Sequence, residues 1–116
     1  MREKNLEIGI LLDFYGELLS ENSRSATDLY YNEDLSLAEI ADSMGITRQG
    51  VRDSIEKATA KLLSFEEKLG LAAKFRKVEE MLTDVTVKLE DIAPSLPESV
   101  SKELYGIIES IKAVES

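Results

Sequence analysis

One stretch, SLAEIADSMGITRQGVRDSI at residues 36–55, constrains the fold more than any other part of the chain. Apolar residues recur at helical spacing on both sides of Gly45, and a glycine adopts a left-handed backbone at little cost. The small Ala41 lets two helices cross closely, and Ile46 is expected to pack inward. This pattern is typical of a helix-turn-helix, whose second helix can enter the major groove of DNA.

Capping residues predict the boundaries of the two helices. Ser36 and Glu39 have the spacing of a capping box, which predicts a first helix at 37–44. Thr47 is a good N-cap for the second helix. The apolar positions of that helix continue at spacings of three and four, so we expect one long helix at 48–69.

Helical periodicity covers the rest of the chain, and no convincing strand pattern interrupts it. Further helices are predicted at about 5–19 and 24–31, ahead of the motif. The expected fold class is therefore all-α. It comprises a helix-turn-helix bundle at 1–70, followed by a C-terminal helical hairpin at 71–116.

The C-terminal region carries a narrow apolar repeat of the heptad type on two helices, separated by a proline-containing turn at 93–99. Two antiparallel helices joined by a short loop can cover each other's apolar seams. The hairpin is expected either to pack on the helix that ends at Leu69 or to form the seam of a homodimer. The repeat comprises Phe75, Val78, Leu82, Val85, Leu89 and Ile92 on the first helix, and Val100, Leu104, Ile107, Ile111 and Val114 on the second.

Composition argues against several kinds of chemistry. The chain has no histidine and no cysteine, which removes thiolate nucleophiles, the usual zinc ligands and the commonest general base. No glycine-rich phosphate loop is present. We therefore predict no enzyme activity, no cofactor and no metal site. No segment approaches the ~20 apolar residues of a membrane span, and no apolar leader is found, so a cytoplasmic protein without membrane contact is expected.

The outward face of the long second helix carries the candidate binding residues. Arg48 and Arg52 are neighbours at i, i+4, and Gln49 lies beside them near the helix N-terminus. Guanidinium groups match phosphates or guanine edges, and glutamine matches adenine. Gly50 leaves the backbone accessible to a partner. The full set of predicted nucleic-acid-binding residues is Ser36, Thr47, Arg48, Gln49, Gly50, Arg52 and Lys57.

The charge distribution limits this prediction. The whole chain has a formal net charge of −9, whereas residues 36–62 hold four basic and four acidic residues. The acidic excess therefore lies outside the motif, and screening over about 8–10 Å lets a local basic patch act despite it. A neutral motif still makes few contacts to phosphates, which favours weak binding to duplex DNA. The acidic surface and the apolar seams suit protein partners equally well.

Three segments together resemble the YlxM family of small bacterial helix-turn-helix proteins: LLDFYGELL at 11–19, DLYYNEDLSLAEIADSMGITRQGVRDSI at 28–55 and EEKLGL at 66–71. That family is similar in fold to the sigma-factor region that reads the −35 promoter element, so the resemblance implies a sigma-factor-like bundle. It also implies a regulator in the signal recognition particle pathway, acting on DNA or on the particle's RNA. The alternative is a protein-interaction module that binds the particle's GTPase, or its complex, without nucleic acid.

Overall fold

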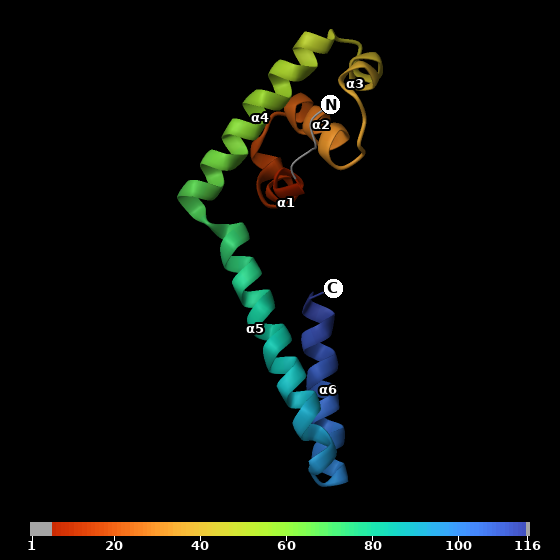
Figure 1. The fold of residues 1–116 in the computed structure, drawn as a ribbon, viewed down its shortest axis with the longest axis vertical. Coiled ribbons are helices and arrows are strands. Elements are labelled where there is room, and N and C mark those ends of the chain that lie inside the picture. Colours follow the sequence, from red (N-terminus) through yellow and green to blue (C-terminus); the bar gives the residue numbers. More distant parts are fainter. Residues whose placement is uncertain (1–5, 116) are drawn as a thin grey trace. The chain divides into compact units, whose positions relative to one another are not determined.

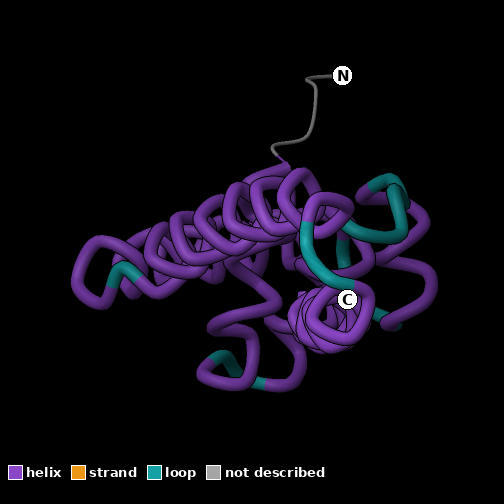
Figure 2. Tube along the Cα trace, turned by 90° about the horizontal axis from the view of Figure 1, so that it is seen from below, coloured by secondary structure: helices purple, strands orange, loops and turns teal. Residues whose placement is uncertain are grey.

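The computed structural model describes residues 6–115, and those residues form helices and loops without any strand (Figures 1 and 2). The all-α class predicted from the sequence is therefore confirmed. The chain forms two compact units, unit 1 (Met1–Ala72) and unit 2 (Ala73–Ser116). Asn5, where the first predicted helix begins, lies outside the described residues.

Unit 1 contains the helices of the predicted motif and those that precede it. Its elements are α1 (Leu6–Tyr15), the 3₁₀ turn η1 (Gly16–Leu18), α2 (Glu21–Tyr31), α3 (Leu37–Met44), α4 (Arg48–Leu69) and the start of α5 (Leu71–Ile92). Both helices of the motif have the boundaries that the capping signals predicted. In contrast, α2 begins three residues earlier than expected, because Ser20 caps it by accepting a hydrogen bond from Ser23 N–H.

The core of unit 1 is built on one face of α4, against which the other helices pack (Figure 1). Its buried side chains recur at spacings of three and four residues, as an amphipathic helix requires. They form two groups. The first packs α1 on the later turns of α4 and includes Ile8, Leu11, Tyr15, Ala58 and Leu62. The second packs α2 and α3 on its early turns and comprises Ala26, Ile40, Ala41, Val51 and Ile55.

The turn of the motif forms largely as its residues predict. Gly45 ends α3 in a left-handed conformation with a φ of 68°. The capping box is present, with Ser36 N–H donating to Glu39 Oε1 at 2.9 Å and Glu39 N–H donating to Ser36 Oγ at 3.1 Å. The inward packing expected for Ile46 is wrong, because this side chain is 43% exposed. Ile46 lies on the outside of the turn, where a Cβ at Gly50 would be 3.8 Å from its Cδ1.

A hydrogen-bond network closes the second left-handed turn, at Gly70 between α4 and α5. The buried Tyr15 hydroxyl donates to Glu66 Oε1 at 2.6 Å and accepts from Leu71 N–H at 3.1 Å. The same carboxylate oxygen accepts from Ala72 N–H at 3.1 Å. The network therefore satisfies two amides at the start of α5, where the helix dipole also favours a negative charge.

Unit 2 is a hairpin in which α5 and α6 (Glu98–Glu115) run antiparallel on either side of the 3₁₀ turn η2 (Ala93–Ser95) (Figure 1). On one side of the hairpin, Lys112 Nζ and Glu90 Oε2 form an ion pair at 3.2 Å. The side chains between the helices are buried or half-buried. They are Leu82, Thr86, Leu89 and Ala93 on α5 and η2, and Ser101, Leu104, Ile108 and Ile111 on α6.

The expectation that the two helices cover each other's seams is wrong for most of the repeat. A helix contacts a single neighbour along one line, and here that line is rotated away from the middle of the predicted seam. Seven of the eleven predicted seam residues therefore face water, with exposed fractions of 42–77%. These are Phe75, Val78, Val85 and Ile92 on α5, and Val100, Ile107 and Val114 on α6.

We expect Gly45→Ala to lower the free energy of unfolding by about 1–2 kcal/mol, because a left-handed backbone costs an L-residue that much. No atom lies within 4 Å of the Cβ that this variant adds, so the loss arises from the backbone. Gly106→Ala is the control, since Gly106 lies inside α6 with equal space, and it should gain roughly 0.5–1 kcal/mol. Urea unfolding followed by circular dichroism measures both. Equal effects at the two positions would contradict the left-handed turn.

Burial and the hydrogen bond to Glu66 raise the pKa of Tyr15 above its ordinary value of 10.0. The stability that this protonated hydroxyl contributes is complete below about pH 10 and is lost as the pH rises through the raised pKa. The urea midpoint of the native chain should therefore fall when the pH is raised from about 9 to about 11. The fall should be smaller in Tyr15→Phe. This variant should also lose about 1–3 kcal/mol at neutral pH, because it leaves Leu71 N–H unpaired. Tyr105→Phe, at an exposed position, is the control. It should have the stability of the native chain at neutral pH and the same fall of the urea midpoint with pH.

Candidate nucleic-acid interface

A shallow hollow of about 390 Å³ lies at the N-terminal ends of α3 and α4. It is lined by Ser36, Leu37 and Ala38 at the start of α3 and by Arg48, Gln49 and Arg52 on the first turns of α4. The two helix starts meet because α3 has only eight residues and packs across α4. Four of the seven residues predicted as nucleic-acid contacts are thus brought together at one place.

Two arginines supply the positive charge of this hollow. Arg48 and Arg52 are exposed on successive turns of α4, and no carboxylate belongs to the lining residues. Within the part of the chain that the structure describes, neither guanidinium forms an ion pair with a carboxylate. Both charges therefore remain available to a ligand.

The N-terminus of α3 adds two backbone donors that the sequence analysis missed. In the capping box, Ser36 and Glu39 satisfy each other's amides. The amides of Leu37 and Ala38 have no hydrogen-bond acceptor among residues 6–115. Such amides point out along the helix axis at the positive end of its dipole. An anion in the hollow would therefore meet two guanidinium groups and two N–H donors.

Gln49, the candidate for base contact, is held by a neighbour on its own helix. Its Nε2 donates to Asp53 Oδ1 at 2.9 Å, one turn further along α4. This bond orients the amide on the outward face but uses one of its two donors. It also places a carboxylate next to a candidate contact residue. The i, i+4 spacing of Gln49 and Asp53 is the signal that could have identified this pair from the sequence.

The remaining predicted residues lie outside the hollow. Thr47 Oγ1 accepts from Gly50 N–H at 2.9 Å and thereby caps α4. A Cβ on Gly50 would lie 3.1 Å from that oxygen, so the missing side chain gives the cap room. Lys57 is exposed, but it comes five residues after Arg52 and is therefore rotated from it by about 140° around the helix axis.

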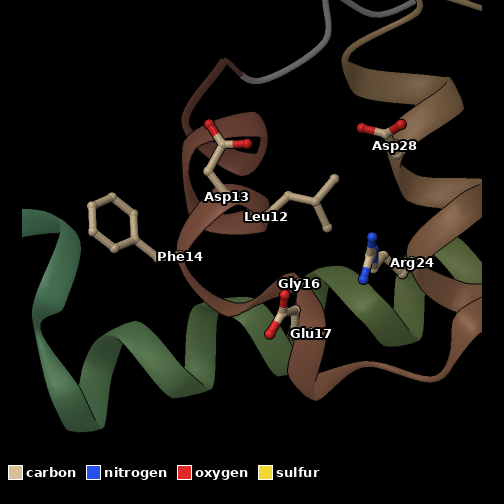
Figure 3. Close-up of a pocket in the computed structure, with 7 residues that line it drawn as sticks. All are labelled: Leu12, Asp13, Phe14, Gly16, Glu17, Arg24 and Asp28. Atoms are coloured by element: carbon tan, nitrogen blue, oxygen red, sulfur yellow. The ribbon is translucent and has the colours of Figure 1, made fainter. Parts of the chain in front are cut away.

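A second hollow, of about 460 Å³, lies between α1, η1 and α2 (Figure 3). Its charged lining residues are the carboxylates Asp13, Glu17 and Asp28 and the single cation Arg24. Three carboxylates around one guanidinium repel a phosphate, so this hollow does not suit nucleic acid. Nor do residues 6–115 contain any cluster of three or more side chains of the metal-ligating types.

None of the described helices has the length and apolar character needed to span a membrane.

Comparison with known proteins tests the resemblance suggested by the sequence. The family described as "Putative helix-turn-helix protein, YlxM / p13 like" matches residues 2–99. A UPF0122 protein of Halalkalibacterium halodurans is 38% identical over 115 residues, which cover 99% of this chain and all of that protein. A UPF0122 protein of Desulforamulus reducens is 41% identical over 106 residues, or 90% of each chain. One from Clostridium kluyveri is 47% identical over 78 residues, which cover 67% of this chain and 70% of that protein. The predicted relationship is confirmed, and the chain belongs to the UPF0122 family of YlxM / p13-like proteins.

Proposed function

We propose that this protein is a nucleic-acid-binding regulatory protein that probes its ligand with the first turns of α4. The observation that carries the proposal is the hollow itself. Two guanidinium groups and two helix amides without partners among the described residues converge there, and no carboxylate is among its lining residues. Helix-turn-helix proteins use contacts of this kind to hold the phosphate backbone. The description of the family as helix-turn-helix supports the same role.

Each group has a distinct part in the proposed contact. A backbone phosphate accepts hydrogen bonds from the amides of Leu37 and Ala38 and an ion pair from Arg52. Arg48 and Gln49, on the first turn of α4, reach base edges or the next phosphate. Because residues 36–62 are neutral overall, the affinity is expected to be modest and to depend strongly on salt.

The resemblance to the YlxM family suggests where such a regulator acts. We propose the signal recognition particle pathway in the cytoplasm, with DNA or the particle's RNA as the ligand. A second candidate function is a protein-interaction module that binds the particle's GTPase, or its complex, without nucleic acid. The net charge of −9 and the exposed apolar side chains of unit 2 support this alternative.

Replacing both arginines of the hollow should remove most nucleic-acid binding. Arg48→Ala with Arg52→Ala should reduce the slope of log affinity against log salt by about 2, since each lost phosphate contact lowers it by about 0.9. Arg48→Glu with Arg52→Glu should abolish binding. Fluorescence polarisation with random duplex DNA and with the particle's RNA, across a salt series, measures both effects and separates the two ligands.

The matched control carries the same change in charge outside the hollow. Lys61 on α4 and Lys102 on α6 are both exposed, and changing both to Glu should leave the salt slope within about 1 of the native value. Equal losses in the control and in the double arginine variant would contradict a specific hollow. Absence of binding to either nucleic acid by the native chain would favour the protein-interaction module.

Asp53→Asn should strengthen nucleic-acid binding by about two- to fivefold. Asparagine keeps an oxygen that can accept the hydrogen bond from Gln49, while the negative charge beside the proposed phosphate contact is removed. Asp84→Asn, an exposed position on α5, makes the same change in net charge and should leave affinity unchanged. The same polarisation assay compares them, and weaker binding by Asp53→Asn would place this face of α4 away from the ligand.

A further inference from the structure

Unit 2 presents an apolar face that its own two helices leave uncovered. Val78, Val85 and Ile92 form one row on α5, with seven residues from each to the next. Val100, Ile107 and Val114 form a second row on α6 with the same spacing. All six side chains are 42–77% exposed. These two rows are named the valine–isoleucine face.

Both rows lie on the same side of the hairpin. At about 100° per residue, each row is rotated by roughly 70–80° from the line along which the two helices touch, in the same sense about each helix. Because the helices run antiparallel, equal rotations bring the rows to one side. Lys112 and Glu90 are rotated from the contact line in the opposite sense, so their ion pair lies on the other side of the hairpin.

The two rows also have the same length and the same heptad spacing. Counting outward from η2, the order is Ile92, Val85 and Val78 on α5, and Val100, Ile107 and Val114 on α6. The face therefore consists of two neighbouring rows of three apolar side chains. All of its members are β-branched residues, which have only modest helix propensity and no evident advantage on a solvated helix surface. Contiguous exposed apolar patches of this kind mark sites of protein association.

We propose that a second copy of this chain covers the valine–isoleucine face, so that two hairpins form an antiparallel four-helix bundle. A second copy supplies two antiparallel helices with rows of the same length and heptad spacing, which allow side chains to interdigitate. A two-fold axis parallel to the helices sets the row on α5 of each copy against the row on α6 of the other. The interface then contains twelve β-branched side chains, six from each copy.

Charge at the margins of the face favours one direction of pairing. Lys88 flanks the row on α5, Glu103 flanks the row on α6, and neither has an ion-pair partner in the described part of the chain. The proposed axis sets α5 of one copy against α6 of the other, which brings Lys88 towards Glu103 of the second copy. Stacking α5 on α5 would instead set Lys88 against Lys88, and like charges in such positions destabilise helix pairs.

Sedimentation equilibrium of the full chain tests the proposal. The native chain should approach twice its monomer mass of 12.9 kDa as its concentration rises. Val85→Glu with Ile107→Glu should raise the dissociation constant at least about a hundredfold, because the proposed interface would bury four carboxylates. Val85→Glu alone should also weaken dimerisation, and Val87→Glu is its matched control. Val87→Glu makes the same change at a position 51% exposed on the same helix, about 160° away around the helix axis, and should dimerise like the native chain.

A charge exchange provides a second test, which does not depend on a variant that disturbs the apolar rows. Lys88→Glu should weaken dimerisation severalfold, and adding Glu103→Lys should restore it. A native chain that stays monomeric at high concentration overturns the proposal, as do equal dissociation constants for Val85→Glu and Val87→Glu. If circular dichroism shows that Val85→Glu with Ile107→Glu is unfolded, the charge exchange becomes the deciding test. If Glu103→Lys then fails to restore dimerisation in Lys88→Glu, the proposed pairing of α5 with α6 of the second copy is wrong. Nucleic-acid binding is measured separately, so its failure would leave this inference standing.

Discussion

Burial of one face of α4 is the interaction on which the rest of unit 1 depends. Val51, Ile55, Ala58 and Leu62 lie along a single stripe, and α1, α2 and α3 all pack against it. Their removal from water is the main stabilising term available to a small helical unit. Once that stripe is buried, the rotation of α4 about its axis is set, and its polar face must point outward.

The candidate interface follows from this constraint together with two local devices. The left-handed turn at Gly45 stops α3 close to the start of α4, and the caps at Ser36 and Thr47 define where each helix begins. The arginines then project beside the amides at the start of α3. A hollow with four positive or hydrogen-donating groups results from ordinary packing and capping, without any buried charge.

The network around Tyr15 has a similar role at the other end of α4. Tyr15 and Glu66 are separated by 51 residues, yet their hydrogen bond holds α1 to the last turns of α4 and caps the start of α5. In unit 2, the ion pair between Lys112 and Glu90 joins two half-exposed side chains. Unit 2 therefore depends more heavily on apolar contact for its stability. Under the proposed association, a second copy of the chain supplies part of that contact.

The sequence by itself determined the helices, because their signals are local. Caps, left-handed glycines and apolar spacing act within a few residues, so α3 and α4 could be predicted to the residue. Three sequence segments were enough to identify the family. Only the tertiary structure decided which groups meet. The amides of Leu37 and Ala38 carry no side-chain signal, and the outward position of Ile46 depends on how the turn packs. The heptad repeat on α5 and α6 likewise specifies an apolar seam but not its partner, since two helices in contact can bury only one line of it.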